Sequence, residues 1–438
     1  MQNEGQIAVE AAADEQSVMA MRAPARKRDN PLTRSVPGMI GMGVLLMMFI
    51  ACLGTLPWTL SSAVGPDGQS LGVPRYDAGA PIEGRLPPSI MPYDDHDIER
   101  ANNAVDREQL ALVAAEHGVS VDALLEARDG EMLELIKPLW PRYMLGSDLL
   151  GRSLMTRLLA GGGISLTIGI AAALLSVTIG TIYGALAAYI GGKVDSLMMR
   201  VVDVLYGLPY ILLVVLLAVA SNAMVDEWVT RAKVKEDWMR TQVIEQHAAE
   251  GETLSRSDAT EVLAHEPALR EQLLGLASVK YPARDLSVGT RTMLDVATLL
   301  IAIGGVSWLT MARVIRGQVL TLKNQPFVEA ARAVGSSPVR IFVRHLLPNL
   351  LGPIIVYATL TVPQAILQES FLSFLGIGVK PPLPSWGNLA AEGLGELNTY
   401  RSHWWLLFFP CLLLGVTLLS MNFVGEGLRE AFDPKRSR

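Results

Sequence analysis

The chain has 438 residues, of which 50% are hydrophobic and 18% charged, with a formal net charge of −6. This composition is too apolar for an ordinary soluble protein, and polar stretches interrupt it too often for a single membrane anchor. It predicts several membrane spans separated by polar segments. Cys52 and Cys411 each lie inside an apolar run, so we expect no disulfide framework. No CxxC or HExxH spacing is present, so we expect no metal site.

Six apolar runs are long enough to cross a bilayer, which needs about 20 residues per helix. They cover residues 38–60, 162–190, 201–221, 293–313, 350–375 and 403–425. The first run lacks the small-x-small cleavage site of a signal peptide and follows a long N-terminal segment, so we expect it to be retained. The sequence therefore predicts an all-α, polytopic membrane protein with six transmembrane helices.

Positive charges near the ends of these runs predict the orientation. Five Lys and Arg residues lie between positions 22 and 34, with one acidic residue among them, which places the tail 1–37 in the cytoplasm. The remaining segments then alternate. Those expected inside are 191–200, 314–349 and the tail 426–438, and those expected outside are 61–161 and 222–292.

The two outside segments are too long to be simple connectors. The first begins as Pro-rich coil and then predicts helices over 106–117, 121–128 and 130–138, with Asp106 as N-cap and Gly118 as the C-terminal stop of the first. The second, 222–292, is polar and helix-prone. Both inserts are open to two interpretations, docking surfaces for a partner or accessory additions to the outer face.

The most informative stretch is the expected cytoplasmic loop that follows Gln325. Pro326 fits the first position of a helix, and Glu329 fits its first turn, where a negative charge suits the helix dipole. Its apolar positions follow helical spacing, at Phe327, Ala330, Ala331 and Val334. Gly335 can end the helix in a left-handed conformation.

A second short helix is expected directly after this glycine. Ser337 fits its N-cap and Pro338 its first position. Its apolar face is formed by Val339, Phe342, Val343, Leu346 and Leu347, whereas Arg340 and Arg344 lie on another face. We expect Pro348 to end it. Periodicity alone leaves two interpretations, a stiff protruding pair of helices or a pair lying on lipid headgroups.

The order of residues in this loop resembles the EAA loop of binding-protein-dependent ABC import permeases. Glu329-Ala330-Ala331 is followed by three residues, Gly335, nine residues, and then His345-Leu346-Leu347-Pro348. The family usually has isoleucine where His345 stands. The run from Arg344 to Asn349 is similar to the dipeptide and oligopeptide branch.

Further stretches resemble the same branch over roughly 140–220 and 293–438. They are Leu145 to Arg152 (LGSDLLGR), Ile164 to Gly169 (ISLTIG), Ser373 to Pro382 (SFLGIGVKPP), Pro384 to Gly387 (PSWG) and Asn422 to Pro434. The family usually has arginine where Gly163 stands. Neither the insert 222–292 nor most of 1–140 shows the resemblance.

The resemblance implies a coupling loop that docks in a groove of a separate ATPase subunit. The residues it assigns to this role are Glu329, Ala330, Ala331, Gly335, Arg340, Arg344, Leu347 and Pro348. It also implies a bacterial inner-membrane permease, without enzymatic activity of its own, that imports peptides or another small solute such as nickel. The implied partners are a homologous second permease, two ATPase subunits and an external substrate-binding protein, within the lipid bilayer and with no nucleic acid.

The chain itself has no GxxxxGK[ST] loop, so we expect ATP and magnesium to be bound by the partner ATPase. Gln364, Gln368 and Glu369 lie in the fifth run, where an ionisable group is a candidate for the translocation path. The alternative for Glu369 is pairing with a neighbouring helix. The rival function, an ion-coupled secondary transporter or channel, would need charged groups near the membrane midplane and usually inverted repeats. The spans hold few charges, and no clear repeat is visible.

Overall fold

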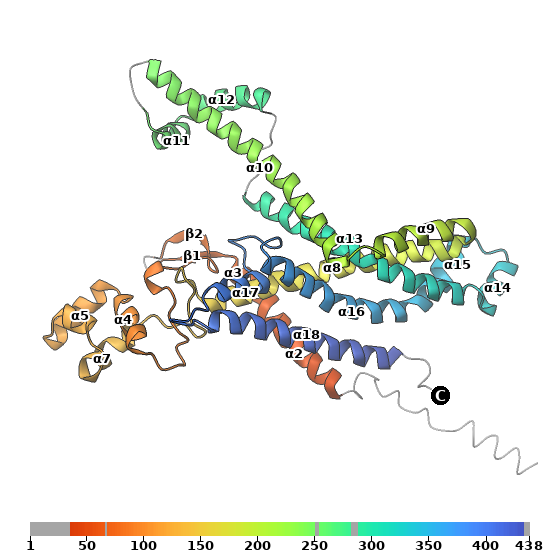
Figure 1. Cartoon of the computed structure of the whole chain (residues 1–438), viewed down its shortest axis with the longest axis horizontal. Coiled ribbons are helices and arrows are strands. Elements are labelled where there is room, and N and C mark those ends of the chain that lie inside the picture. The colour runs from red at the N-terminus through yellow and green to blue at the C-terminus, as the bar shows by residue number, and fades with distance from the viewer. Residues whose placement is uncertain (1–35, 66–67, 250–253, 282–287, 433–438) are drawn as a thin grey trace, which may run out of the picture.

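The computed structural model describes residues 36–65, 68–249, 254–281 and 288–432. The basic residues that predicted a cytoplasmic N-terminus, and the tail after 432, lie outside these described residues. Apart from one two-stranded sheet, the regular structure of the described part is helical, so the predicted all-α fold is confirmed. The long helices lie side by side in an elongated bundle (Figure 1).

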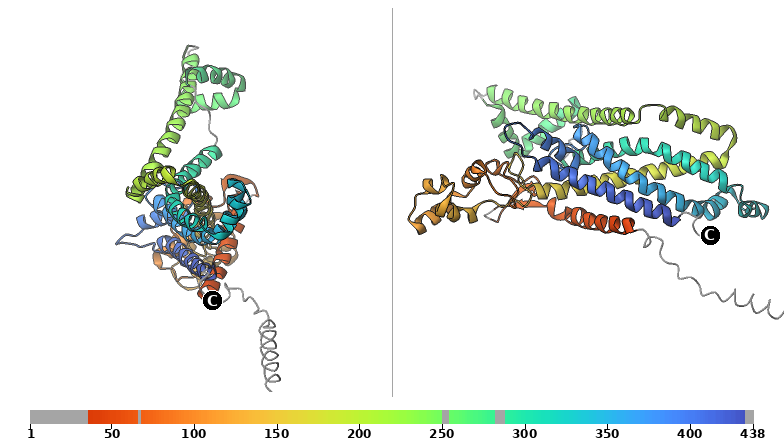
Figure 2. Two further views of the ribbon diagram at one scale, coloured as in Figure 1. Left: turned by 90° about the vertical axis from the view of Figure 1, so that its right-hand side faces the viewer. Right: turned by 60° about the horizontal axis from the view of Figure 1, so that its bottom comes forward.

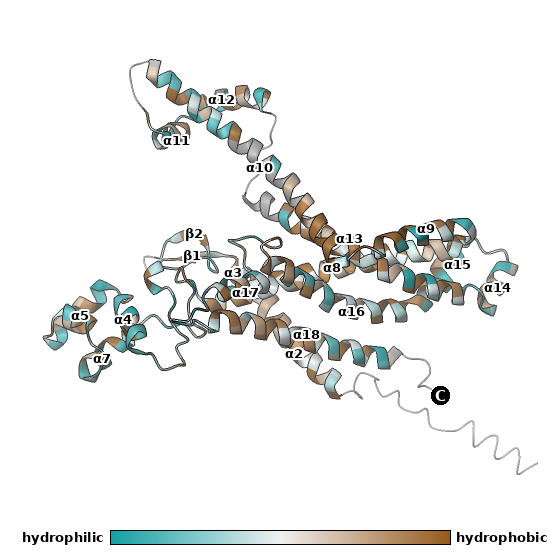
Figure 3. Cartoon of the chain, viewed as in Figure 1, coloured by the Kyte–Doolittle hydropathy of each residue, from teal (hydrophilic) through white to brown (hydrophobic). Residues whose placement is uncertain are grey.

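Five described helical stretches are long and apolar enough to cross a membrane. They are α2 with α3 (Val36–Gly54 and Leu56–Thr59), α8 (Leu154–Ile190), α13 (Val288–Leu322), the run through α15, η4 and α16 (Pro338–Phe374), and α18 (Trp405–Phe432). Their apolar surfaces form the hydrophobic middle of the bundle (Figure 3). Several of these helices extend beyond the predicted runs: α8 begins at Leu154 and α18 continues to Phe432.

The third predicted span, 201–221, falls on two helices that meet at a bend. The chain forms α9 (Gly192–Tyr206) and α10 (Tyr210–Ala249), which meet at an angle of 88°. The break falls at Gly207-Leu208-Pro209. Proline has no N–H for the helix ladder and disfavours helical conformation in the residue before it, which explains the interruption. Counted as one bent span, the pair gives a sixth crossing.

The centre of the bundle is α8, which packs against α13, α16, α2 and α9. Gly180 and Gly184 lie very close to α13. A Cβ at Gly180 would lie 2.5 Å from Met311 Cβ, and one at Gly184 would lie 2.2 Å from the Ala312 carbonyl oxygen. Small residues at this spacing let two helix backbones approach closely. This GxxxG step therefore serves packing between α8 and α13.

The first insert forms a small unit at one end of the bundle. It contains β1 (Ser62–Val64) paired antiparallel with β2 (Ser70–Pro74), η2 (Pro81–Glu83), α4 (Asp95–Asn103), α5 (Arg107–His117), α6 (Val121–Leu125), α7 (Gly130–Ile136) and η3 (Lys137–Leu139). The predicted caps of α5 are confirmed: Asp106 accepts a hydrogen bond from the Glu108 N–H, and Gly118 has a φ of 66°. The helix predicted over 121–128 ends earlier, at Leu125.

The second insert forms a helical arm that continues directly from a membrane-spanning helix. α10 continues without interruption from its apolar first half into the arm, where α11 (Arg256–His265) and α12 (Pro267–Lys280) fold back against it. The arm has its own apolar core, formed by Met239, Val243, Ala259, Leu263, Leu273 and Ala277. Both inserts lie toward the same end of the molecule, and α14 (Pro326–Ala333) lies at the other (Figures 1 and 2).

Candidate functional site

The helix α14 ends in a tightly hydrogen-bonded turn at Gly335. We call α14, this turn and the following helix α15 the elbow. Gly335 has a φ of 81°, in the left-handed region. Its N–H donates to the Arg332 carbonyl (2.9 Å), and the Ser336 N–H donates to the Ala331 carbonyl (3.1 Å). These two bonds form a Schellman motif, which satisfies the carbonyls at the helix end. The predicted left-handed stop at Gly335 is confirmed.

After the elbow, the chain enters the next span without a second break. Ser337 caps α15 (Pro338–Ile341) by accepting from the Arg340 N–H, as predicted. The prediction that Pro348 ends this helix is wrong. The π-turn η4 (Phe342–Leu346) joins α15 to α16 (Leu347–Phe374), and the Leu347 N–H donates to the Phe342 carbonyl. Pro348 sits in the first turn after this wider turn, where its missing N–H is tolerated.

The elbow is fastened to the bundle by three buried apolar side chains. Val328, Ile341 and Leu346 are at most 2% exposed and pack in one cluster with residues of α8 and α13. The predicted apolar stripe only partly faces the bundle. Ala331 is half-buried and packs against this cluster beside the buried Val328, whereas Phe327, Ala330 and Val334 are exposed.

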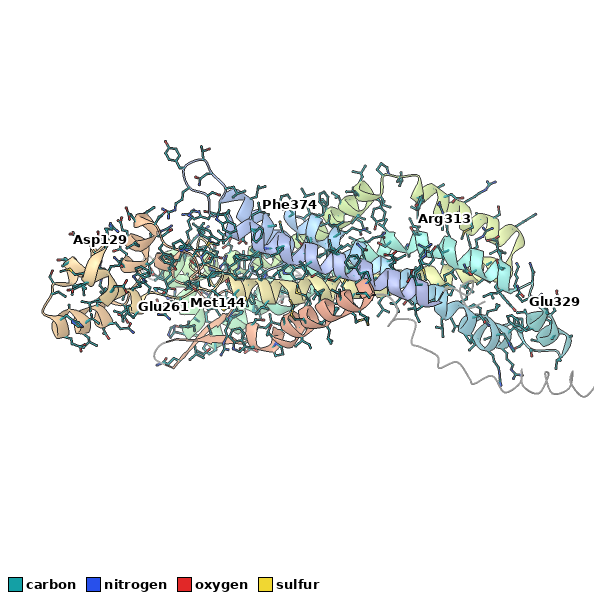
Figure 4. The ribbon with its side chains drawn as sticks, turned by 90° about the horizontal axis from the view of Figure 1, so that it is seen from below. Asp129, Met144, Glu261, Arg313, Glu329 and Phe374 are labelled. Carbon is teal, nitrogen blue, oxygen red and sulfur yellow. The ribbon has the colours of Figure 1, made fainter. Side chains whose placement is uncertain are left out.

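The free surface of the elbow combines apolar and basic groups. Val334 is 85% and Val339 72% exposed, and Phe327 and Val343 are also exposed. Of the predicted coupling residues, Glu329, Ala330, Gly335, Arg340, Arg344 and Pro348 are exposed, while Ala331 and Leu347 are half-buried. Figure 4 shows Glu329 at the tip of this end, with Arg313 nearer the middle. An exposed apolar face on a rigid support can receive a partner protein.

An ion pair and a hydrogen bond join the helices at the base of the elbow. Arg316 of α13 donates to both carboxylate oxygens of Asp195 in α9, at 2.6 and 2.7 Å. Lys323, just after α13, donates to the Ala188 carbonyl near the end of α8 at 2.8 Å. These contacts tie α8, α9 and α13 together where the chain leaves for α14.

The three candidates for the translocation path do not share one face of α16. Gln364 is exposed, and Gln368 is half-buried and accepts a hydrogen bond from the Tyr210 hydroxyl at 2.8 Å. That hydroxyl also lies 2.7 Å from Ser307 Oγ. Glu369, one position further along the helix, is fully buried. Gln364 and Gln368 can therefore face a pathway or a partner, whereas Glu369 is enclosed by this chain.

A buried arginine joins elements at the end of the bundle that carries the first insert, a role that the sequence motifs did not assign. Arg157, which is 2% exposed, donates through Nη1 to Asp148 (2.7 Å) and Glu392 (2.5 Å). Asp148 also pairs with Arg152, which reaches Asp77 in the first insert. The pairs join the insert, α8 and α17 (Trp386–Gly395). The only sequence signal was the family-like run from Leu145 to Arg152, which contains two of these residues.

A second ionic group joins the first insert to the start of α18. Arg85 donates two hydrogen bonds to Glu396, at 2.7 and 2.9 Å, and His403 Nδ1 lies 3.1 Å from the same carboxylate. The Arg85 guanidinium holds the pKa of the Glu396 carboxyl below its usual value. Burial lowers the pKa of His403. Arg401 pairs with Asp94 and Asp97 of the insert. The insert is therefore fixed to the bundle through several independent contacts.

The unusual Gly163 has a local explanation. A Cβ at this position would lie 2.6 Å from Leu56 Cγ, because α3 packs directly on α8 there. An arginine would require at least the Leu56 side chain to move. Among the described residues, no group of His, Cys, Asp and Glu is arranged to hold a metal ion.

Comparisons with known proteins agree with this geometry. Residues 176–438 match the family described as "Binding-protein-dependent transport system inner membrane component". The chain is 37% identical over 296 residues to the dipeptide transport system permease protein DppC of Bacillus subtilis, covering 68% of this chain and 70% of the relative. It is 36% identical over 310 residues to the oligopeptide transport system permease protein OppC of Haemophilus influenzae, covering 71% and 76%.

A third relative, the oligopeptide transport system permease protein OppC of Escherichia coli, is 36% identical over 293 residues, covering 67% of this chain and 72% of the relative. The family match includes the C-terminal part of α8 and all of α13, α16 and α18. The chain is a multi-pass membrane protein and belongs to the family of inner-membrane components of binding-protein-dependent transport systems.

Proposed function

We propose that this chain is the permease subunit of an ATP-driven importer of dipeptides or oligopeptides, and that its elbow couples an ATPase to the transport pathway. The observation that carries the proposal is the exposed surface of α14 and α15 on a rigid, internally hydrogen-bonded support. An apolar face with basic residues beside it suits a groove in a separate protein. The curated relatives with peptide-transport names support the class of substrate.

In this proposal, the chain pairs with a second, homologous permease. Two ATPase subunits bind ATP and magnesium and receive one elbow each, and an external binding protein delivers the peptide. Closure of the ATPases draws the two elbows together. Because α15, η4 and α16 form one continuous helical run, movement of an elbow is transmitted along α16. The pathway then alternates between outward and inward access.

The orientation belongs to the same proposal. The elbow faces the cytoplasm, as does the N-terminus, and both inserts face outward from the bacterial inner membrane. The charge pattern of the short loops supports this orientation. The position of the two inserts at the end opposite α14 is consistent with it (Figure 2).

The half-buried group of Tyr210, Ser307 and Gln368, with the exposed Gln364, is a neutral hydrogen-bonding surface on the proposed path. Amide and hydroxyl groups can pair with a peptide backbone whatever the side chains of the peptide are. This feature suits an importer of varied peptides.

The test is the Glu329→Lys variant in the complete transporter. Reversing the charge in the first turn of α14 should weaken the helix terminus and its docking, so less ATPase should co-purify and uptake of a labelled peptide should fall at least several-fold. Arg332→Lys, which keeps the charge of an exposed position in the same helix, is the control. Unchanged ATPase co-purification in Glu329→Lys would contradict the coupling role. Peptide uptake that persists without any ATPase subunit would favour an ion-coupled transporter instead.

A further inference from the structure

A buried carboxylate lies where three helices meet near the end of the bundle that carries the first insert. Glu369 of α16 is 0% exposed. It accepts hydrogen bonds from the hydroxyls of Ser373 (2.7 Å) and Ser370 (3.3 Å). The side chains of Ser165 in α8 and Ser385 at the start of α17 also interact with its carboxylate. Among the described residues, no cation pairs with Glu369, so hydroxyl groups alone compensate its burial.

The serines around Glu369 are themselves fixed by backbone groups. Ser373 Oγ accepts from the Val379 N–H at 2.9 Å, and Ser165 Oγ accepts from the Trp386 N–H at 3.3 Å. Ser385 Oγ accepts from the Asn388 N–H at 3.3 Å as the N-cap of α17. Each hydroxyl proton is therefore free to point at the carboxylate. Glu369 thus gathers α8, α16, the connection 375–384 and the first turn of α17 at one point, which we call the serine joint.

The backbones at the serine joint are in direct contact. A Cβ at Gly387 would lie 2.1 Å from the Ser370 carbonyl oxygen, and one at Gly161 would lie 3.2 Å from Ser385 Cα. Trp386 is fully buried between these elements and donates through Nε1 to the Leu158 carbonyl. Such close packing leaves α17 little room to slide on α8 or α16.

The serine joint lies near the C-terminal end of the helical run that begins at the elbow. That run extends from Pro338 to Phe374 and reaches Glu369 without a break. Beyond the joint, α17 is bound by Arg157 through Glu392, and the residue that follows α17, Glu396, is bound by Arg85. One carboxylate therefore connects the run from the elbow to the element that carries the outer ionic contacts.

We propose that Glu369 is a positioning residue that makes α17 follow α16 and α8 as one rigid body, so that ATP-driven movement of the elbow reaches the outer mouth of the pathway through α17. The inference rests on the proposed function, because it concerns the way in which the same permease transmits movement. Glu369 is then not a group that touches the peptide.

The experiment measures the spread of distances between two spin labels in the complete transporter reconstituted in lipid. One label replaces Leu394 on α17 and the other Leu174 on α8, both exposed, in a background with exposed Cys411 changed to Ser. The unaltered joint should give one narrow distribution, with the same mean in the ATP-free and ATP-bound states. Glu369→Ala should widen it at least twofold. It should also reduce ATP hydrolysis stimulated by the loaded binding protein several-fold, while basal hydrolysis and co-purification stay within twofold.

Two milder variants keep the test decisive if Glu369→Ala does not assemble. Glu369→Gln retains acceptors and shape and should widen the distribution less, and Ser373→Ala removes the shortest hydrogen bond and should widen it to an intermediate degree. Glu261→Gln, an exposed charge removal on the arm, is the matched control and should match the unaltered protein.

A narrow distribution with normal stimulation in Glu369→Ala, or in both milder variants if Glu369→Ala does not assemble, would overturn the proposal. Reduced assembly with normal stimulation per assembled complex would show that Glu369 is only structural, and would overturn it too. If Glu369→Ala widens the distances but the unaltered transporter imports no peptide, the peptide function would be refuted and the proposal for the serine joint would remain.

Discussion

The buried ionic group around Arg157 predicts an unusual order of mutational effects. Asp148 is the common acceptor of this group. It receives hydrogen bonds from Arg157 (2.7 Å), from the Arg152 side chain (2.7 Å), and from the N–H groups of Leu150 and Arg152, both at 2.9 Å. Glu392, the other partner of Arg157, has a side chain that is 40% exposed and can turn to water.

Removing Asp148 should therefore cost more than removing Arg157. Asp148→Ala leaves the guanidinium of a 2% exposed arginine without its buried partner, and breaking a buried pair in this way costs about 3–5 kcal/mol. Arg157→Met leaves Asp148 with Arg152 and two backbone donors. Its loss is closer to that of one charge-assisted hydrogen bond, about 1.5–3 kcal/mol.

The assay is the fraction of purified protein that remains monodisperse after heating, for both variants and for the double variant. In the double variant no charged Arg157 remains to lose its buried partner, so the double variant should be no less stable than Asp148→Ala alone. Arg128→Met, which removes an exposed arginine paired with Glu99, is the control and should change stability by about 0–1 kcal/mol. Equal effects of the two single variants, or strictly additive losses in the double variant, would refute this account of the ionic group.

Three further outcomes follow from the fold. Gly335→Val should remain in the membrane but lose most peptide uptake. A residue with a side chain is strained by about 1–2 kcal/mol at a left-handed position, although no neighbouring atom lies within 4 Å of where its Cβ would be. Normal uptake would show that this turn is not needed for transport. Cysteines at Ser120 and Ser257 should react with an impermeant thiol reagent in intact cells whose outer membrane, if present, is permeabilised, whereas one at Ser336 should not, and the reverse pattern would invert the proposed orientation. Replacing 226–286 with a short Gly/Ser linker should leave membrane insertion and ATPase co-purification intact, because the apolar core of the arm is formed within the arm; loss of both would show that the arm is integral to the bundle.

The features that could be predicted from the sequence are those fixed by neighbours along the chain. Gly335 and Ser337 each determine a local backbone conformation through bonds to residues at most a few positions away, so their roles could be inferred from residue type and spacing. The caps of α5 were predictable for the same reason. The apolar runs gave the spans because bilayer thickness imposes their length.

The ion pairs that join the first insert to the bundle could not be predicted in this way. Arg157 and Glu392 are 235 positions apart, and Arg85 and Glu396 are 311 apart, so neither pair has a local signature. Two prolines had effects that the prediction missed, for different reasons. Pro209 lies inside the apolar run 201–221, whose hydropathy predicts a membrane span but not the bend within it. Pro348 lies where a π-turn precedes it, and that turn depends on how η4 packs against the bundle.

The continuous helix α10 has a mechanical consequence for the arm. At 1.5 Å per residue its 40 residues are about 60 Å long, roughly twice the thickness of the hydrocarbon core of a bilayer. A small tilt of the half of α10 that lies beside α13 therefore becomes a larger displacement at the other end of α10, where α11 and α12 pack. A fluorophore on α11 would report movements of the bent third span at a magnification that no probe placed inside the bundle could match.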